Sequence, residues 1–227
     1  MIKQQFSGES KMSVTASELN DSNAQILRDA VSKDYLSVKR VLDVLTVIAV
    51  LPVVAVIMTV VAVMIKLESP GSVFFWQKRV GMNGKTFNML KFRSMTSDSE
   101  KHGSQFAQSN DMRVTRVGKV IRKLRIDELP QLWNVFKGEM SIIGPRPEQE
   151  SFVKEFNKTI PNYSMRHLVR PGITGLAQTE QGYVADTDGT VVKLRYDLYY
   201  IRNISFLTDL QIVLKTIGTI LTGFGAR

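Results

Sequence analysis

One long apolar stretch near the N-terminus dominates the hydropathy pattern of the chain. Residues 44–65 contain no charged side chain over 22 positions, whereas residues 1–35 are polar and rich in Ser, Asn and Gln. At about 1.5 Å per residue, a helix of this length spans a hydrocarbon layer about 30 Å thick. A helix buried in a soluble domain is rarely apolar on every side for so long. The pattern therefore predicts a membrane helix over residues 37–67, preceded by a flexible polar tail over residues 1–36.

Pro52 interrupts this apolar stretch. Because proline has no N–H and crowds the preceding turn, a kink or a break in the helix is expected there. Basic residues stand on both sides of the stretch, with Lys39 and Arg40 before it and Lys66 after it, which favours a cytoplasmic position for both ends. Two arrangements stay open on these residues alone. One is a kinked helix that crosses the membrane, and the other is a re-entrant helix, broken at Pro52, that enters and leaves through one leaflet.

Shorter patterns follow in residues 68–227, which are expected to form one compact domain. Residues 73–95 place aromatic and β-branched residues on either side of Asn83-Gly84, which predicts a small β-hairpin. Residues 113–126 space apolar side chains at helical intervals among basic ones, which predicts a basic amphipathic helix. Further helices are expected, the last with an apolar stripe that fits either the core or the membrane interface: residues 148–158, 193–202 and 204–221. The predicted fold class is α+β and helix-rich.

The composition of the chain excludes several kinds of catalytic and metal-binding site. The chain has no cysteine, so disulfides, thiolate catalysis and cysteine-based metal sites are excluded. It has two histidines, His102 and His167, which are too few for a multi-histidine metal site. The net charge of +9 arises entirely in residues 66–227, which indicates an anionic partner such as phosphate, nucleic acid or a membrane surface.

Two adjacent carboxylates, Asp127 and Glu128, stand just before Pro130 at the junction of two predicted helices. Since proline disfavours helical geometry in the residue before it, the first helix is expected to break at Leu129 and the second to begin at Pro130. The unpaired N–H groups at the start of that second helix suit a phosphate group. On this spacing alone, a carboxylate that only caps the second helix stays open as an alternative to a chemical role.

Several cations accompany the carboxylates in the sequence. Lys91 and Arg93 are two residues apart on a predicted strand and therefore share a face, although a solvated face would carry the same pattern. Arg146 lies between two prolines, which stiffen the backbone and suit its guanidinium to bidentate phosphate binding. Arg170 begins a loop that contains glycines.

Carboxylates and cations without useful cysteine or histidine fit phosphoryl transfer, which also needs a metal ion such as Mg²⁺. An aspartate carboxylate can itself be the nucleophile and form an acyl phosphate. The sequence has no Walker A motif, no G-x-G-x-x-G motif and no kinase H-R-D motif, so the common nucleotide-binding folds are not indicated.

A series of different short motifs follows along the chain: Lys39-Arg-Val-Leu-Asp43, Pro52, Pro70-Gly-Ser-Val-Phe-Phe75, Gln77-Lys-Arg-Val-Gly81, Lys91-Phe-Arg-Ser-Met95, residues 124–134, Gly138-Glu-Met-Ser141, Gly144-Pro-Arg-Pro147, residues 169–175 and Tyr196-Asp-Leu-Tyr-Tyr200. Taken together they resemble the bacterial sugar transferases of the monotopic phosphoglycosyl transferase class. The resemblance covers residues 37–222, and its specificity rests on the number and order of the motifs, because any one of them alone is weak.

The resemblance implies a two-step reaction. Asp127 would attack the β-phosphate of a UDP-sugar, release UMP and hold the phosphosugar covalently. Undecaprenyl phosphate, or another polyprenyl phosphate, would then accept the phosphosugar. Glu128 would assist in proton handling and at Mg²⁺, for which both carboxylates are candidate ligands. The candidates for binding substrate and phosphate are Lys91, Arg93, Arg122, Arg146, Arg170 and Asp197, of which Arg170 has the weaker support.

The resemblance also implies the re-entrant arrangement at Pro52, with the enzyme monotopic on the cytoplasmic face of the bacterial inner membrane. The reaction would be the first membrane step of exopolysaccharide or glycoconjugate synthesis. Membrane lipids are expected partners, a homo-oligomer is possible, and nucleic acid is not expected. Two rival functions stay open: a transferase that moves only the sugar and releases UDP, and a membrane-anchored basic protein that binds anionic lipid. The identity of the sugar is not indicated.

Overall fold

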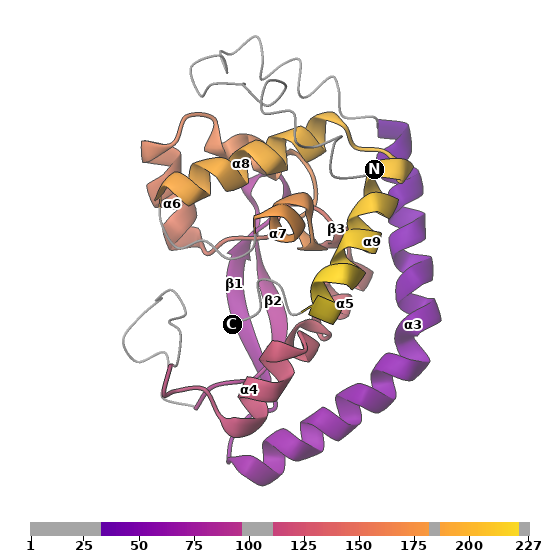
Figure 1. The fold of residues 1–227 in the computed structure, drawn as a ribbon, viewed down its shortest axis with the longest axis vertical. Coiled ribbons are helices and arrows are strands. Elements are labelled where there is room, and N and C mark those ends of the chain that lie inside the picture. The colour runs from indigo at the N-terminus through magenta and orange to yellow at the C-terminus, as the bar shows by residue number, and fades with distance from the viewer. Residues whose placement is uncertain (1–32, 97–110, 182–186, 223–227) are drawn as a thin grey trace.

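The computed structural model describes residues 33–96, 111–181 and 187–222 (Figure 1). Its α-helices are α3 (Lys33–Glu68), α4 (Arg116–Lys123), α5 (Gln131–Lys137), α6 (Glu150–Thr159), α7 (Leu176–Glu180), α8 (Thr187–Arg202) and α9 (Phe206–Thr222). Its strands are β1 (Phe74–Val80), β2 (Thr86–Phe92), β3 (Ser141–Ile143) and β4 (Gly172–Thr174). Three 3-10 helices connect them, η2 (Met82–Gly84), η3 (Ile126–Glu128) and η4 (Tyr163–Leu168). The helix-rich character predicted from the sequence is confirmed, while residues 1–32 of the expected tail lie outside the described residues.

The apolar N-terminal stretch forms a single helix, α3, which begins at Lys33 rather than at residue 37. Its helical backbone continues through Pro52, near the middle of its length. Figure 1 shows that α3 bends part-way along its course and follows one side of the molecule. The helix is therefore bent but not interrupted, and the break expected at Pro52 is not observed. A bend satisfies the same sterics, because losing one hydrogen bond to proline leaves the flanking turns intact.

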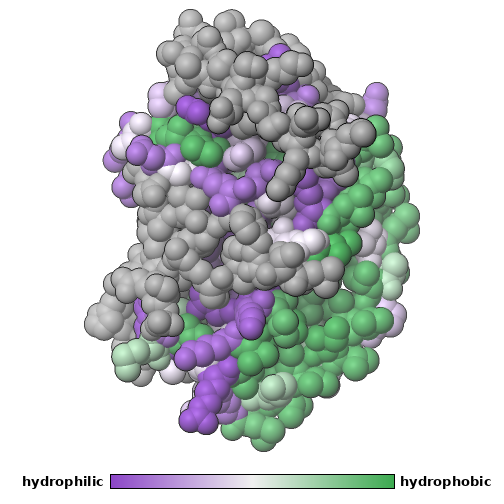
Figure 2. Space-filling view, viewed as in Figure 1, coloured by the Kyte–Doolittle hydropathy of each residue, from purple (hydrophilic) through white to green (hydrophobic). Residues whose placement is uncertain are grey.

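Most of the apolar surface of α3 is exposed. Val47, Val54, Val61 and Ile65 are buried against the rest of the protein and lie on one face of the helix, and most residues between them are exposed. Only 17% of its most apolar 18-residue stretch is buried, which is unlike the core helix of a soluble domain. Figure 2 shows hydrophobic surface over the side of the molecule that α3 occupies. The described residues contain one helix, α3, whose length and apolar composition would allow it to cross a membrane.

The C-terminal helix α9 adds to this apolar surface. Leu210, Leu214 and Ile217 are 43%, 61% and 50% exposed, whereas Ile212 on the opposite side is buried. The stripe that the sequence left open between core and interface is thus outside the core. Such an exposed apolar stripe beside α3 fits an interfacial position.

Both ends of α3 are attached to the same globular body. Near its start, Lys39 forms a 2.5 Å ion pair with Asp209 of α9. At its end, the Glu68 carboxylate accepts a 2.7 Å hydrogen bond from the Arg116 N–H and a longer bond from the Val117 N–H, at the start of α4. Glu68 thereby satisfies N–H groups that the first turn of α4 leaves unpaired.

Two small sheets position the loops of the site. β1 and β2 form the predicted antiparallel hairpin, and its turn holds Asn83 and Gly84 at φ values of 56° and 74°. β3 and β4 form a parallel pair that the sequence pattern did not indicate, because each strand is only three residues long. A Cβ atom on Gly172 of β4 would lie 2.1 Å from the backbone nitrogen of Gly144, so this close approach requires glycine.

Separate hydrophobic clusters hold these elements together. One packs Val61 and Ile65 of α3 against Phe92 of β2 and Ile121 of α4. Another packs Ile143 of β3 against residues of η4, α8 and α9. These clusters fix β2, α4 and β3, the elements that carry or precede several of the candidate site residues.

Candidate active site

The two carboxylates lie on η3, which joins α4 to α5. The chain changes direction before them, at Arg125, which adopts the left-handed conformation with φ of 55°. Leu129 is helical, with φ of −55° and ψ of −36°, so the break predicted there is wrong. The restriction that proline places on the preceding residue is only a preference, and here the turn is made earlier in the chain, at Arg125.

Neither carboxylate caps α5. The N-cap residue is Pro130, which makes no side-chain capping hydrogen bond. The Glu128 carboxylate instead accepts hydrogen bonds from both terminal nitrogens of Arg146, one of them at 3.2 Å. The Asp127 carboxylate makes no hydrogen bond within the described part of the chain. The capping alternative is therefore excluded, and both oxygens of Asp127 are available.

Three cations from separate elements lie near this acidic pair. Lys91 comes from β2, Arg122 from the last turn of α4, and Arg146 from the loop that follows β3. The positive charges of all three lower the pKa of Asp127. The structure thus brings together five of the residues that the sequence singled out, although they lie as far as 55 positions apart in the chain, from residue 91 to residue 146.

The surroundings give the two carboxylates different properties. Burial, together with the charge of Glu128, raises the pKa of Asp127 in spite of the three cations. Burial also acts to raise the pKa of Glu128, but Arg146 and Lys91 outweigh it and hold that pKa well below its usual range. Burial and the nearby Arg146 lower the pKa of Lys91 to about 8. Glu128 is therefore a fixed anion paired with Arg146, and Asp127 is the more basic carboxylate.

Arg93 lies outside this group of residues. Its guanidinium donates to the carbonyl oxygens of Pro70 at 2.5 Å and Ser69 at 2.8 Å. Since β2 ends at Phe92, the strand alternation that would place Arg93 beside Lys91 does not extend to it. Arg93 fixes the chain that follows α3, and the prediction that it binds phosphate is not supported by its position.

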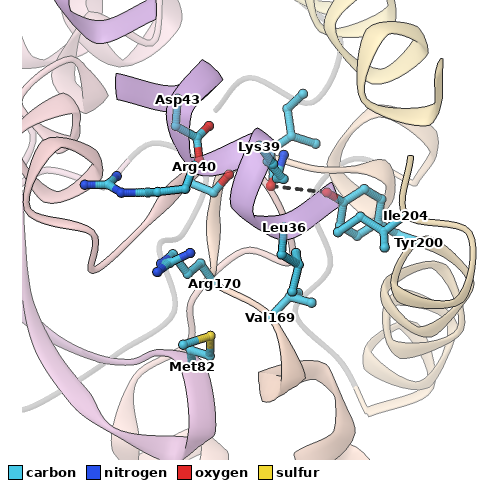
Figure 3. Close-up of a pocket in the computed structure, with 11 residues that line it drawn as sticks. Leu36, Lys39, Arg40, Asp43, Met82, Val169, Arg170, Tyr200 and Ile204 are labelled. Atoms are coloured by element: carbon cyan, nitrogen blue, oxygen red, sulfur yellow. Dashed lines mark hydrogen bonds between the residues drawn. The ribbon is translucent and has the colours of Figure 1, made fainter. Parts of the chain in front are cut away.

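Arg170 lies at the other end of α5. Its Nε donates to the Gly138 carbonyl oxygen at 3.0 Å, while Arg40 of α3 donates to the carbonyl oxygens of Val135 and Phe136 at 2.5 and 2.8 Å. Figure 3 shows Arg40 and Arg170 in the lining of one small pocket. Because the last carbonyls of a helix attract cations, Arg170 binds the helix end and not the surroundings of Asp127.

Asp197 is buried behind the site. Its carboxylate forms a 2.7 Å ion pair with Arg166, and Arg166 in turn donates a 2.8 Å hydrogen bond to the backbone carbonyl of Arg146. The sequence motifs predicted that Asp197 lies in or near the site but did not indicate Arg166, which connects Asp197 to the Arg146 backbone. Arg166 lies on the 3-10 helix η4, which has no periodic pattern that would have indicated a role.

Asn134 of α5 is a second residue whose role was missed. Its side chain is fully buried, accepts a 2.9 Å hydrogen bond from the Leu90 N–H and donates a 2.8 Å bond to the Asn88 carbonyl. These bonds fix α5 against β2 beside Lys91. A polar residue among Leu132, Trp133 and Val135 was the available signal, since a buried amide must find partners.

The acidic pair is also the candidate metal site. The described residues contain no group of three acidic or histidine side chains that could hold a metal ion. Mg²⁺, however, is commonly bound by one or two carboxylates and completed by water and substrate phosphates. Asp127 has free oxygens, and each Glu128 oxygen keeps a lone pair beyond its bond to Arg146. The two residues therefore fit Mg²⁺ completed by a bound diphosphate.

A long exposed apolar helix joined to an acidic pair among cations defines a membrane-associated protein with a site suited to phosphate-containing ligands. The chain belongs to the bacterial sugar transferase family, whose model matches residues 34–223.

Several named proteins are similar to this chain. It is 59% identical over 193 residues to the UDP-N-acetylgalactosamine-undecaprenyl-phosphate N-acetylgalactosaminephosphotransferase of Aeromonas hydrophila, covering 85% of this chain and 46% of the relative. It is 41% identical over 186 residues to a UDP-glucose:undecaprenyl-phosphate glucose-1-phosphate transferase of Caulobacter vibrioides, covering 81% and 70%. The exopolysaccharide production protein PSS of Rhizobium leguminosarum is 39% identical over 194 residues, covering 82% and 96%. The chain thus spans less than half of the Aeromonas relative and nearly all of the Rhizobium one.

Proposed function

We propose that this protein transfers a sugar 1-phosphate from a UDP-sugar to undecaprenyl phosphate, which releases UMP and gives a polyprenyl diphosphate sugar. The observation that carries the proposal is the Asp127 carboxylate, which has no hydrogen bond among the described residues and yet lies beside Lys91, Arg122 and Arg146. Such a site attracts a diphosphate and presents an oxygen nucleophile to it. The names of the Aeromonas and Caulobacter relatives support the same reaction.

In the first proposed step, a carboxylate oxygen of Asp127 attacks the phosphorus that carries the sugar. A bond from Asp127 to phosphorus forms, the bond from that phosphorus to the bridging oxygen breaks, and UMP leaves with the bonding electrons. In the second step, an oxygen of the lipid phosphate attacks the same phosphorus, and the Asp127 carboxylate is restored. Negative charge spreads over the phosphoryl oxygens in both steps, and Lys91, Arg122 and Arg146 are positioned to stabilise it.

Glu128 acts, in this proposal, as a fixed anion. Its low pKa makes it a poor proton acceptor near neutral pH. Its charge raises the pKa of Asp127, which makes that carboxylate a better nucleophile, and its ion pair orients Arg146. The proton-handling role implied by the family resemblance is therefore less well supported than an electrostatic one.

Asp127 and Glu128 are also proposed to hold Mg²⁺ together with the donor diphosphate. When bound, the metal supplies positive charge beside the leaving phosphate. EDTA is expected to abolish UMP release, and Mg²⁺ in excess is expected to restore it. Full activity in EDTA would remove the metal from the proposal.

We further propose that α3 is re-entrant and keeps the enzyme on the cytoplasmic face of the inner membrane. Both ends of α3 bind one globular body, at Asp209 and at Arg116. A helix with its ends on opposite sides of the bilayer could not do this without drawing the polar body into the hydrocarbon. A shallow position also places the site at the depth of a lipid phosphate.

The absence of native cysteine allows this topology to be tested by labelling. Asp34→Cys and Ser72→Cys would each place one exposed thiol beyond an end of the apolar stretch. A membrane-impermeant maleimide is expected to label both in inside-out vesicles and neither in spheroplasts. Labelling of one of the two in spheroplasts would instead indicate a crossing helix.

The reaction itself is tested by nucleotide release from a panel of UDP-sugars, with Mg²⁺ and undecaprenyl phosphate in detergent. UDP-N-acetylgalactosamine is the first donor to try, since the Aeromonas relative named for it is 59% identical. UMP from one donor, lost in Asp127→Asn, is the expected result. Release of UDP would favour a sugar-only transferase. Release of neither nucleotide, with salt-sensitive binding to anionic vesicles, would favour the lipid-binding alternative, and UMP release that survives in Asp127→Asn would contradict the covalent step.

A further inference from the structure

The loop that presents Arg146 is held at four successive carbonyls. The oxygens of residues 145, 146, 147 and 148 accept hydrogen bonds from four different donors, which come from three separate parts of the chain: the Gly172 N–H at 3.0 Å, Arg166 Nη2 at 2.8 Å, Arg79 Nη1 at 3.1 Å and the Val80 N–H at 2.9 Å. A loop with no freedom at four successive peptide groups holds its side chain in one place.

The donor to the Arg146 carbonyl, Arg166, is itself fixed by buried partners. Its Nε and Nη2 contact one Asp197 oxygen at 3.0 and 2.7 Å, and its Nη1 donates to the Tyr163 hydroxyl at 2.8 Å. Arg166 and Asp197 are 3% and 2% exposed, so neither can touch a substrate. Buried ion pairs contribute little net stability compared with apolar side chains of the same volume, so stability is a weak reason for this pair. Its contact with the Arg146 carbonyl suggests another, the placement of the loop.

We propose that Arg166, held by Asp197, is a positioning residue that acts on the reaction through Arg146. The connection runs from Asp197 to the Arg166 guanidinium, from there to the Arg146 backbone, and from the Arg146 side chain to Glu128 beside Asp127. This inference rests on the proposed function, because it assigns the consequence of the contact to transfer of the phosphosugar. Without Arg166, Arg146 keeps its charge and loses its fixed place.

A mutant cycle tests this connection. Arg146→Gln is expected to lower kcat for UMP release by about 100-fold, as loss of one fixed stabilising donor does. The double variant Arg166→Met with Asp197→Leu removes both buried charges together, which often preserves folding, and is expected to lower kcat by about 10-fold or more. Combining all three substitutions is expected to give a kcat within about threefold of Arg146→Gln alone, since Arg166 has no effect to exert once Arg146 is gone.

A purely structural role gives a different result. Independent effects multiply, so a combined variant that is about 10-fold or more slower than Arg146→Gln alone would overturn the proposal. The matched control is another buried ion pair, Lys39–Asp209, replaced by Lys39→Met with Asp209→Leu. Whatever loss this control causes is expected to multiply with that of Arg146→Gln.

Thermal unfolding of each variant shows whether it folds. If the Arg166/Asp197 double variant does not fold, Arg166→Lys replaces it, because lysine keeps the charge beside Asp197 and lacks the fork that also reaches the Arg146 carbonyl. The loss of kcat in Arg166→Lys is likewise expected not to multiply with the loss in Arg146→Gln.

The same cycle on UDP affinity, measured by calorimetry, separates this proposal from the proposed reaction. UDP binding without UMP release, with effects that fail to multiply, would leave the positioning role standing and remove the reaction. UMP release by the parent protein, with effects that multiply in both measurements, would remove the positioning role alone. A parent protein that neither binds UDP nor releases UMP would overturn both.

Discussion

The two ends of α5 differ in what their cations bind. At the C-terminal end, Arg40 and Arg170 donate to backbone carbonyl oxygens of the last turn. Before the N-terminal end, Lys91, Arg122 and Arg146 surround the acidic pair. A helix offers unpaired carbonyls only at its C-terminus, so cations there find partners in the backbone. Cations near an N-terminus find none, and what they bind must be a carboxylate or an anion from outside.

This difference explains why Arg170 and Arg146 are not equivalent in the structure. In the sequence they look alike, because each stands next to proline in a loop that also contains glycine. Arg170 is already bound by the fold. Arg146 is bound to Glu128, a partner whose charge keeps the guanidinium beside Asp127. In the proposed function, the arginines at the C-terminal end of α5 therefore serve stability, and those near its N-terminal end act in the reaction. Substitutions at the two ends should separate activity from stability.

The largest effect is expected for Asp127→Asn, which removes the proposed nucleophile with little change in volume. UMP release should fall by about 1,000-fold or more. The unfolding temperature should be no lower than that of the parent, because Asp127 makes no hydrogen bond in the described structure and burial already disfavours its charge. The matched control is Glu139→Gln, whose carboxylate bonds Asn134 and Lys137 beyond the other end of α5. Its activity should stay within about threefold of the parent, because glutamine keeps an oxygen that can accept the bond from Asn134. Equal losses of UMP release in Asp127→Asn and Glu139→Gln would contradict the difference proposed between the two ends of α5.

Arg146→Lys comes next in size. Lysine keeps the positive charge and cannot make the two parallel bonds to Glu128. We expect kcat to fall by about 10-fold to 100-fold, less than for Arg146→Gln. Steady-state kinetics over a range of donor concentrations measures it. A lysine variant as active as the parent would mean that charge alone suffices and that the bidentate contact is irrelevant to the reaction.

The pH dependence of activity should reflect both Asp127 and Lys91. Asp127 must lose its proton to attack, so activity should rise as the pH passes its raised pKa. Lys91, with a pKa lowered to about 8, loses its charge above that pH, so activity should then fall. In Lys91→Arg the cation stays protonated, and the decline at alkaline pH should move upward. An unmoved decline would assign it to another group.

The smallest effect on turnover is expected for Arg170→Gln. Removing the cation from the end of α5 should lower the free energy of unfolding by about 1–2 kcal/mol. The kcat of the folded protein should stay within about threefold of the parent, since Arg170 binds the Gly138 carbonyl and not the acidic pair. Chemical denaturation and UMP release measure the two quantities. A large loss of kcat without loss of stability would return Arg170 to the active site.

The sequence predicted those features that depend on neighbours along the chain. The 22 apolar residues of α3, the hairpin around Asn83-Gly84 and the adjacent Asp127 and Glu128 needed only local periodicity, turn chemistry and covalent adjacency. Even so, local rules misplaced the turn before the carboxylates, because the left-handed conformation of Arg125 has no signature in sequence. The parallel pairing of β3 with β4 was also missed, since strands of three residues have too little periodicity to detect.

By itself, the sequence determined that this protein has a long apolar helix, a basic domain and an acidic pair, because composition and spacing are properties of the chain. Only the tertiary structure decided which cations join the pair. Lys91, Arg122 and Arg146 are placed by the packing of β2, α4 and β3, while Arg93, Arg170 and Asp197 are taken up by the chain after α3, the end of α5 and Arg166. A side chain binds whichever charge or carbonyl the fold brings close to it. The distance between two such groups in the folded protein cannot be calculated from their separation along the chain.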